Sequence, residues 1–170
     1  MKIQSLFPLQ FTSRFSSNLV FFFLLAGLIT ILWYPFNDGD VWWHIAVGQE
    51  ILQNHAIPTV DEWTFTANGH PYLYHSWLSD LLLAVVWHSS GNFGLEILKV
   101  SIHLATCLYI FFLLRRFAKM SYSIGLTLIF AFWLSSCPIR PFIITPLFTL
   151  ILMDWFYFDF RETRKRFISV

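Results

Sequence analysis

Two closely spaced carboxylates, Asp38 and Asp40, follow directly after a long apolar segment, in the sequence Asn-Asp-Gly-Asp-Val-Trp-Trp-His. A carboxylate at the boundary between a membrane and water can meet a lipid-borne group on one side and a water-borne group on the other. The low dielectric of the membrane edge raises the pKa of a carboxyl group, which suits it to act as a general base. The alternative is structural, a solvated acidic turn in which Asp40 caps the helix that follows.

His44 lies four residues after Asp40, so the two side chains share one face if this segment is helical. Asp40 could then orient the imidazole ring, or the pair could hold a divalent metal ion together with His70 and His75. The sequence contains no dedicated metal-binding spacing such as His-Glu-x-x-His, so no metal ligand is assigned. A divalent metal ion stays open as a cofactor, and histidines without a special role are the alternative.

Two basic residues, Arg140 and Lys99, are candidates for binding a phosphate group, because a guanidinium offers several donors in one plane. Arg140 could instead extend to lipid head groups. Lys99 could pair with Glu96, three residues earlier in the sequence. His103 and Asp154 lie inside apolar segments, where an ionisable group is costly and is therefore a functional candidate.

The composition of the chain is that of a membrane protein. Hydrophobic residues make up 56% of the 170 residues and charged residues only 12%, against about 25% charged in a soluble domain. The net charge of +1 gives no basic field for nucleic acid. Four apolar segments predict transmembrane helices at about 18–36, 93–114, 121–138 and 141–158. The apolar stretch 77–88 is too short to cross a bilayer and predicts an interfacial helix.

The basic residues predict the orientation of these helices, because Lys and Arg concentrate on the cytoplasmic side. None occurs from Phe15 to Leu98. The sequence therefore predicts one domain, 1–170: an all-α integral membrane protein of four spans, multi-pass in the inner (plasma) membrane. Both ends lie in the cytoplasm, and residues 37–92 form a large outer loop with two short interfacial helices. Were 77–88 a full span, Arg115, Arg116 and Lys119 would move outside, so four spans are preferred.

The order of several short motifs resembles the N-terminal part of the GT-C superfamily of polytopic membrane glycosyltransferases. That superfamily includes protein O-mannosyltransferases and the lipid A aminoarabinose transferases. The resemblance covers the chain from Val20 to about Asp159. The acidic motif after the first membrane helix is Asp38–His44, the helix ending at a proline is Gly48–Pro58, and the Asn-Gly-x-Pro-Tyr turn is Asn68–Tyr72. The short helix ends near the two glycines of Gly91–Gly94. The two basic helix ends are Arg115-Arg116 and Arg140-Pro141.

The resemblance implies transfer of a sugar from a polyprenyl-phosphate donor to an acceptor at the outer membrane face. It implies that Asp40, or as second choice Asp38, is the catalytic base. Arg140 and Lys99 would bind the departing phosphate, and His44 and His75 would contribute to substrate binding. Members of that superfamily are much longer, so the chain is expected to be a truncated frame, a split subunit or a decayed copy.

Two alternatives to an enzyme stay open. One is a small non-catalytic membrane subunit that assembles with a larger partner, and the other is a transporter or metal-binding membrane protein. An enzyme predicts that Asp38, Asp40 and Arg140 converge on one outer cavity. A subunit predicts an exposed apolar face without that convergence, and a transporter predicts a polar path through the bilayer.

Overall fold

The computed structural model describes residues 9–33, 35 and 38–168, with side chains from residue 18 to residue 157 within those ranges. The regular secondary structure of this part of the chain is helical apart from one isolated β-bridge between Val60 and Pro71, and turns and irregular segments connect the helices. The helices follow in the order α1 (Leu9–Leu32), α2 (Asp40–Asn54), α3 (Trp77–Arg115), α4 (Met120–Ser135) and α5 (Thr145–Ile168).

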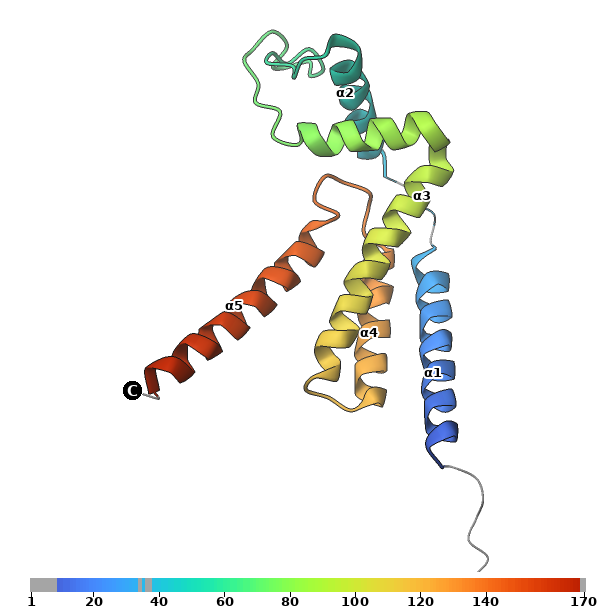
Figure 1. The fold of residues 1–170 in the computed structure, drawn as a ribbon. Helices are drawn as coiled ribbons and strands as arrows, with labels where there is room; N and C mark the ends of the chain where they lie inside the picture. Colours follow the sequence, from blue (N-terminus) through green and yellow to red (C-terminus); the bar gives the residue numbers. More distant parts are fainter. Residues whose placement is uncertain (1–8, 34, 36–37, 169–170) are drawn as a thin grey trace, which may run out of the picture.

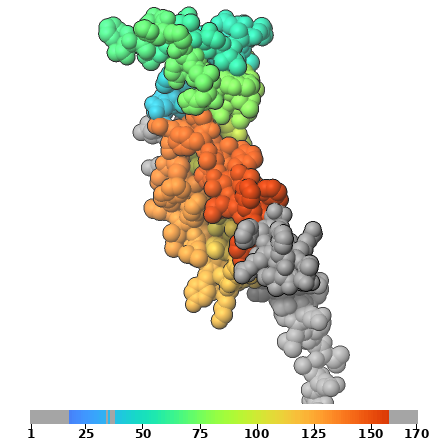
Figure 2. Space-filling model, turned by 90° about the vertical axis from the view of Figure 1, so that its left-hand side faces the viewer, coloured from blue at the N-terminus to red at the C-terminus, as the bar shows by residue number. Residues whose placement is uncertain are grey.

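The helices form a narrow stem with a wider cap at one end (Figure 1). We define the stem as α1, α4 and the part of α3 after Gly91, and the cap as residues 40–90. Within the cap, α2 packs against the first part of α3. The last helix, α5, starts below the cap and diverges from the stem along its length (Figure 1). The space-filling view shows the cap extending beyond the width of the stem (Figure 2).

A single glycine separates the two parts of α3. Gly91 has φ 56° and ψ −146°, a backbone conformation that is not helical and that side chains disfavour. The change of direction sends the residues before Gly91 across the cap and those after it down the stem (Figure 1). The sequence predicted the end of the cap helix near this glycine, and the helical backbone conformation is interrupted there, within the 39 residues of α3.

Separate apolar clusters hold the stem and the cap. The stem cluster joins α1, α3 and α4, and its buried members are Leu24, Leu28, Leu32, Val100, Cys107, Phe111, Ala131 and Leu134. The second cluster holds the cap to the residues next to it: Val41 and Ile45 of α2 contact Leu83 and Leu95 of α3 and Ile139 of the α4–α5 connector. All five residues are almost fully buried. The connector is therefore fixed to α2, which matters for the site described below.

The prediction of four transmembrane helices with a large outer loop is wrong. Within the described residues, only α3 is long and apolar enough to span a membrane. The apolar helix Met120–Ser135 has 16 residues, about 24 Å at the helical rise, which is short of a hydrocarbon core of about 30 Å. In α1, the part with described side chains is the apolar segment Asn18–Leu32. The predicted span 141–158 begins in a non-helical connector, because α5 starts only at Thr145.

The predicted outer loop 37–92 and the predicted orientation with both ends in the cytoplasm depended on four spans, so they are wrong as well. The segment is mostly a packed helical cap, because α2 and the first part of α3 bury apolar residues against each other. Hydropathy measures how apolar a segment is, but it does not show whether lipid or a neighbouring helix covers that segment. Residues 34, 36 and 37, at the end of the first predicted span, lie outside the described residues, as do the basic side chains at both ends of the chain.

Gly48 permits the close approach of α2 and α3. A Cβ atom at this position would collide with the backbone carbonyl of Asp80 and lie 2.8 Å from the Cβ of Ala84. We expect Gly48→Ala to lower the free energy of unfolding by about 2–3 kcal/mol. The reason is that the backbone of Asp80 cannot move away from the added methyl group as the flexible end of a side chain can. Denaturant unfolding in detergent, followed by circular dichroism, measures this loss.

Gly125 of α4 provides the matched control for Gly48. No atom lies within 4 Å of a Cβ built on it, so Gly125→Ala should leave stability unchanged or raise it by up to about 1 kcal/mol. If Gly48→Ala were as stable as Gly125→Ala, the close contact between α2 and α3 would be disproved.

Candidate functional site

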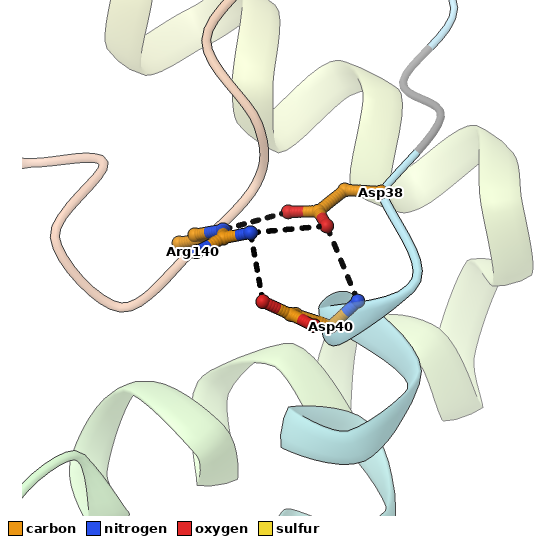
Figure 3. Close-up of polar contacts among 3 residues, drawn as sticks. All are labelled: Asp38, Asp40 and Arg140. Carbon is orange, nitrogen blue, oxygen red and sulfur yellow. Dashed lines mark hydrogen bonds and ion pairs between the residues drawn. The ribbon is translucent and has the colours of Figure 1, made fainter.

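Arg140 lies between Asp38 and Asp40 and binds both (Figure 3). Its Nε donates to Oδ2 of Asp38 at 2.8 Å, and its Nη2 donates to Oδ1 of Asp38 at 3.3 Å. Nη2 also lies 2.7 Å from Oδ2 of Asp40. The three residues that the sequence predicted to meet are thus brought together, although 102 positions separate Asp38 from Arg140. Their roles in chemistry remain a prediction.

Local packing explains this convergence. Asp40 opens α2, whose residue Val41 is fully buried in the cap cluster. Ile139, next to Arg140, is fully buried in the same cluster. Two neighbouring apolar anchors therefore bring the polar residues beside them within reach of each other.

The two aspartates differ in exposure. The side chain of Asp38 is 13% exposed, and it also accepts the backbone N–H of Asp40 at 3.2 Å. Hydrogen bonds from Arg140 hold the pKa of Asp38 below its ordinary value of 3.8. Asp40 is 55% exposed and has one contact with the guanidinium. Gly39 occupies the N-cap position of α2, so the alternative of Asp40 as a capping residue is wrong.

His44 pairs with Asp80, not with Asp40 as the spacing predicted. Its Nδ1 lies 2.8 Å from Oδ1 of Asp80, while the hydroxyl of Ser76 donates to Oδ2 of Asp80 at 3.0 Å. Asp80 is almost completely buried in the first turn of α3. The residues Ser76, Asp80 and His44 therefore form a chain from the start of α3 to the middle of α2.

A cavity of about 220 Å³ lies between α2, the start of α3 and the α4–α5 connector. It opens beside the cluster of Asp38, Asp40 and Arg140, because Arg140 forms part of its wall. His44 and His75, both predicted to bind substrate, line it together. Its walls are formed by Trp43, His44, Val47, Tyr72, Tyr74, His75, Ser76, Asp80, Arg140, Pro141 and Phe142.

The segment after α2 is folded over this cavity by Asp61. Its carboxylate accepts the backbone N–H groups of Trp63 and Thr64, each at 2.9 Å, and the Thr64 hydroxyl at 2.7 Å. Gly69, with φ 80°, closes the turn that lets His70 accept a hydrogen bond from the backbone of Asp61. The turn places the following aromatic residues, Tyr72 and Tyr74, at the cavity wall.

An apolar groove of about 470 Å³ lies on the other side of Phe142, between α3, α4 and α5. Phe142 lines both the groove and the polar cavity. The two spaces therefore adjoin at this side chain. The other residues of the groove are Ile110, Phe130, Trp133, Thr145, Pro146, Thr149 and Leu150.

The remaining predicted residues do not join the site. Lys99 is buried in α3, where its Nζ lies 2.9 Å from the carboxylate of Glu96, the structural alternative considered above. Asp154 binds Arg116 at 2.9 Å and accepts the Tyr109 hydroxyl at 2.8 Å, an attachment of α5 to α3. In the described part of the chain, no group of three or more acidic, histidine or cysteine side chains is placed to hold a metal ion.

Sequence reasoning missed Asp80 and Phe142. Asp80 carried a signal, since it is the one charged residue in the apolar stretch 77–88 and follows Ser76 by one helical turn. Phe142 carried no such signal in the sequence, because the two spaces that it lines exist only when the connector is folded.

Comparison with known proteins finds no match for the chain among protein-family models, curated proteins or solved structures. The resemblance to membrane glycosyltransferases therefore rests on the motifs in the sequence.

Proposed function

We propose that this chain is a membrane-bound glycosyltransferase, active alone or within a larger assembly, that transfers a sugar from a polyprenyl-phosphate donor to an acceptor hydroxyl. The observation that supports this most is the junction at Phe142 between a charged cavity and an apolar groove. A donor of this class has the same two parts, a polar sugar phosphate and a long apolar chain. The motif resemblance described above points to the same chemistry.

The surface of the stem supports a location in a membrane. Large apolar side chains on three stem-side helices are more than half exposed: Phe22, Phe23, Ile129, Phe132, Trp133, Met153, Trp155 and Phe156. A soluble monomer rarely exposes so much contiguous apolar surface. We place the part of α3 after Gly91 across the bilayer and the cap at its surface. The finer location, the inner (plasma) membrane with more than one crossing, is part of this proposal.

The cluster provides a base and a cation for the transfer. Among the described residues, Nη1 of Arg140 has no hydrogen-bond partner, so the guanidinium can still receive a phosphate oxygen. A phosphate there would compete with the exposed Asp40 for Arg140, while the more buried Asp38 keeps its two bonds. Asp40, once released, is the base in this proposal.

The step itself is an inverting displacement. Asp40 takes the proton of the acceptor hydroxyl as that oxygen forms its bond to the anomeric carbon. The bond from the anomeric carbon to the phosphate oxygen breaks, and its electron pair leaves with the polyprenyl phosphate. Arg140 stabilises the negative charge that develops on this leaving group.

Undecaprenyl phosphate is the test probe, because it has the isoprenoid chain and the phosphate that define this class of donor. We expect native mass spectrometry of the chain in nanodiscs to show undecaprenyl phosphate retained in preference to phosphatidylglycerol. Phe142→Ala should reduce this retention about tenfold, because it removes the wall shared by groove and cavity. Phe148→Ala is the control, since Phe148 is an exposed α5 residue that does not line the groove. No preference in the wild type, or equal retention by both variants, would contradict the proposal.

The exposed face of α5 favours a second function, that of a non-catalytic subunit of a membrane assembly. Met153, Trp155 and Phe156 are each about 60% exposed, and α5 diverges from the stem (Figure 1). A subunit of this kind needs its apolar face but not its carboxylates. Full activity of the assembly with Asn at position 40 would therefore favour this second function.

A further inference from the structure

The inner wall of the cavity combines flat apolar faces with polar groups. Trp43, Tyr72, Tyr74 and Phe142 supply aromatic rings, and Tyr72 and Tyr74 meet edge to face at 4.4 Å. Burial holds the pKa of Tyr74 above its ordinary value, so its hydroxyl stays protonated. Aromatic faces beside a few placed polar groups suit a ring that has C–H bonds on its faces and hydroxyls at its edge.

The pair of His44 and Asp80 fixes what this wall offers to a ligand. A carboxylate only accepts hydrogen bonds, so Nδ1 of His44 carries the proton that it donates to Asp80. In the neutral ring, Nε2 is then an acceptor. His44 is about one-fifth exposed and lines the cavity, so this acceptor is available to a hydroxyl group.

Charge and size restrict the ligand further. The buried carboxylate of Asp80 disfavours an anion beside it, and Arg140 is the cation in the cavity wall. A volume of about 220 Å³ is below the range of about 300–1,000 Å³ for sites of drug-sized ligands. One neutral ring fits these limits, whereas an oligosaccharide does not.

We infer that this cavity binds the sugar ring of the donor, packed on the aromatic wall, with Nε2 of His44 accepting a hydrogen bond from a sugar hydroxyl. This inference rests on the proposed function, which it deepens. It gives each of the three parts of the donor its own place: the chain in the groove, the phosphate at Arg140 and the sugar in the cavity. His44 and Asp80 thereby become positioning residues for the sugar.

Saturation-transfer NMR on the chain in nanodiscs tests this inference with neutral methyl glycosides of glucose, galactose, mannose, arabinose and N-acetylglucosamine. We expect at least one of them to bind with millimolar affinity. His44→Phe keeps a flat ring without an acceptor and should weaken that binding about fivefold to tenfold, the effect of one hydrogen bond. His44→Gln keeps an acceptor near the position of Nε2 and should restore part of it.

His88→Phe is the matched control, because His88 is an exposed residue of the same cap that does not line the cavity. Circular dichroism of each variant confirms its fold. No binding of any glycoside, or equal binding by His44→Phe and His88→Phe, would overturn the inference. Retention of undecaprenyl phosphate is measured separately, so the sugar site can fail while the proposed function stands.

Discussion

Replacing Asp40 with Asn is expected to reduce sugar transfer by about 10²–10⁴-fold, the usual contribution of a general base. The amide has nearly the shape of the carboxylate but cannot take the proton of the acceptor hydroxyl. Asp40 is the better candidate of the two aspartates because it is 55% exposed and keeps one contact with Arg140. The measurement is the turnover of a radiolabelled polyprenyl-phosphate sugar by the variant in nanodiscs, at saturating donor.

Asp38→Asn provides the contrast for Asp40→Asn. Arg140 holds Asp38 in its ionised form, which makes Asp38 a weak base and an anchor for the guanidinium. Its replacement should weaken donor binding more than turnover, because Arg140 would lose part of its support. Unchanged turnover in Asp40→Asn would remove Asp40 from the chemistry. A larger loss of turnover in Asp38→Asn would transfer the role of base to Asp38.

The sequence predicted the carboxylate–arginine cluster because each residue had a visible local reason. Asp38 and Asp40 follow an apolar helix, and Arg140 precedes Pro141 where another helix was expected. Both positions were expected at one membrane face, so their meeting followed even though the count of spans was wrong. The convergence depends on the chain reversing between these positions, and it does not depend on how many helices cross a bilayer.

The hydrogen-bond partner of His44 could not be predicted from the spacing of nearby residues. Spacing along a helix favoured Asp40, four residues away, but His44 binds Asp80, 36 positions later. That contact exists because Gly48 lets α3 approach α2 closely. A glycine in a helix shows in the sequence only as a weak helix former. Its role as a packing position becomes evident only when the neighbouring helix is seen.

A similar limit applies to the helix predicted at residues 77–88. Residues 77–88 are apolar, and were read as lying at a membrane surface, but much of their apolar face is covered by α2. The kink at Gly91 then separates them from the stem part of α3. Apolar character alone does not show whether a segment is covered by another helix or by lipid.

Replacing Arg140 with Met is expected to lower the free energy of unfolding markedly at pH 7. Arg140 is about one-third exposed, so solvent partly screens its pairs with the two aspartates. The variant leaves Asp38 and Asp40 facing each other without a cation. Arg140→Lys is the control, and it should recover part of the loss because it keeps the charge but not the planar set of donors.

The pH dependence of this loss identifies its cause. The pKa of Asp38 is lowered in the folded protein, so the pair stabilises the fold above the ordinary value and ceases to do so as the pH falls through the lowered pKa. In Arg140→Met, the two carboxylates repel each other at neutral pH and are relieved by protonation. The stability difference between wild type and variant should therefore be greatest near pH 7 and shrink below about pH 4. Thermal unfolding in detergent from pH 3 to pH 7 measures this, and a difference that does not change with pH would show that Arg140 acts by packing alone.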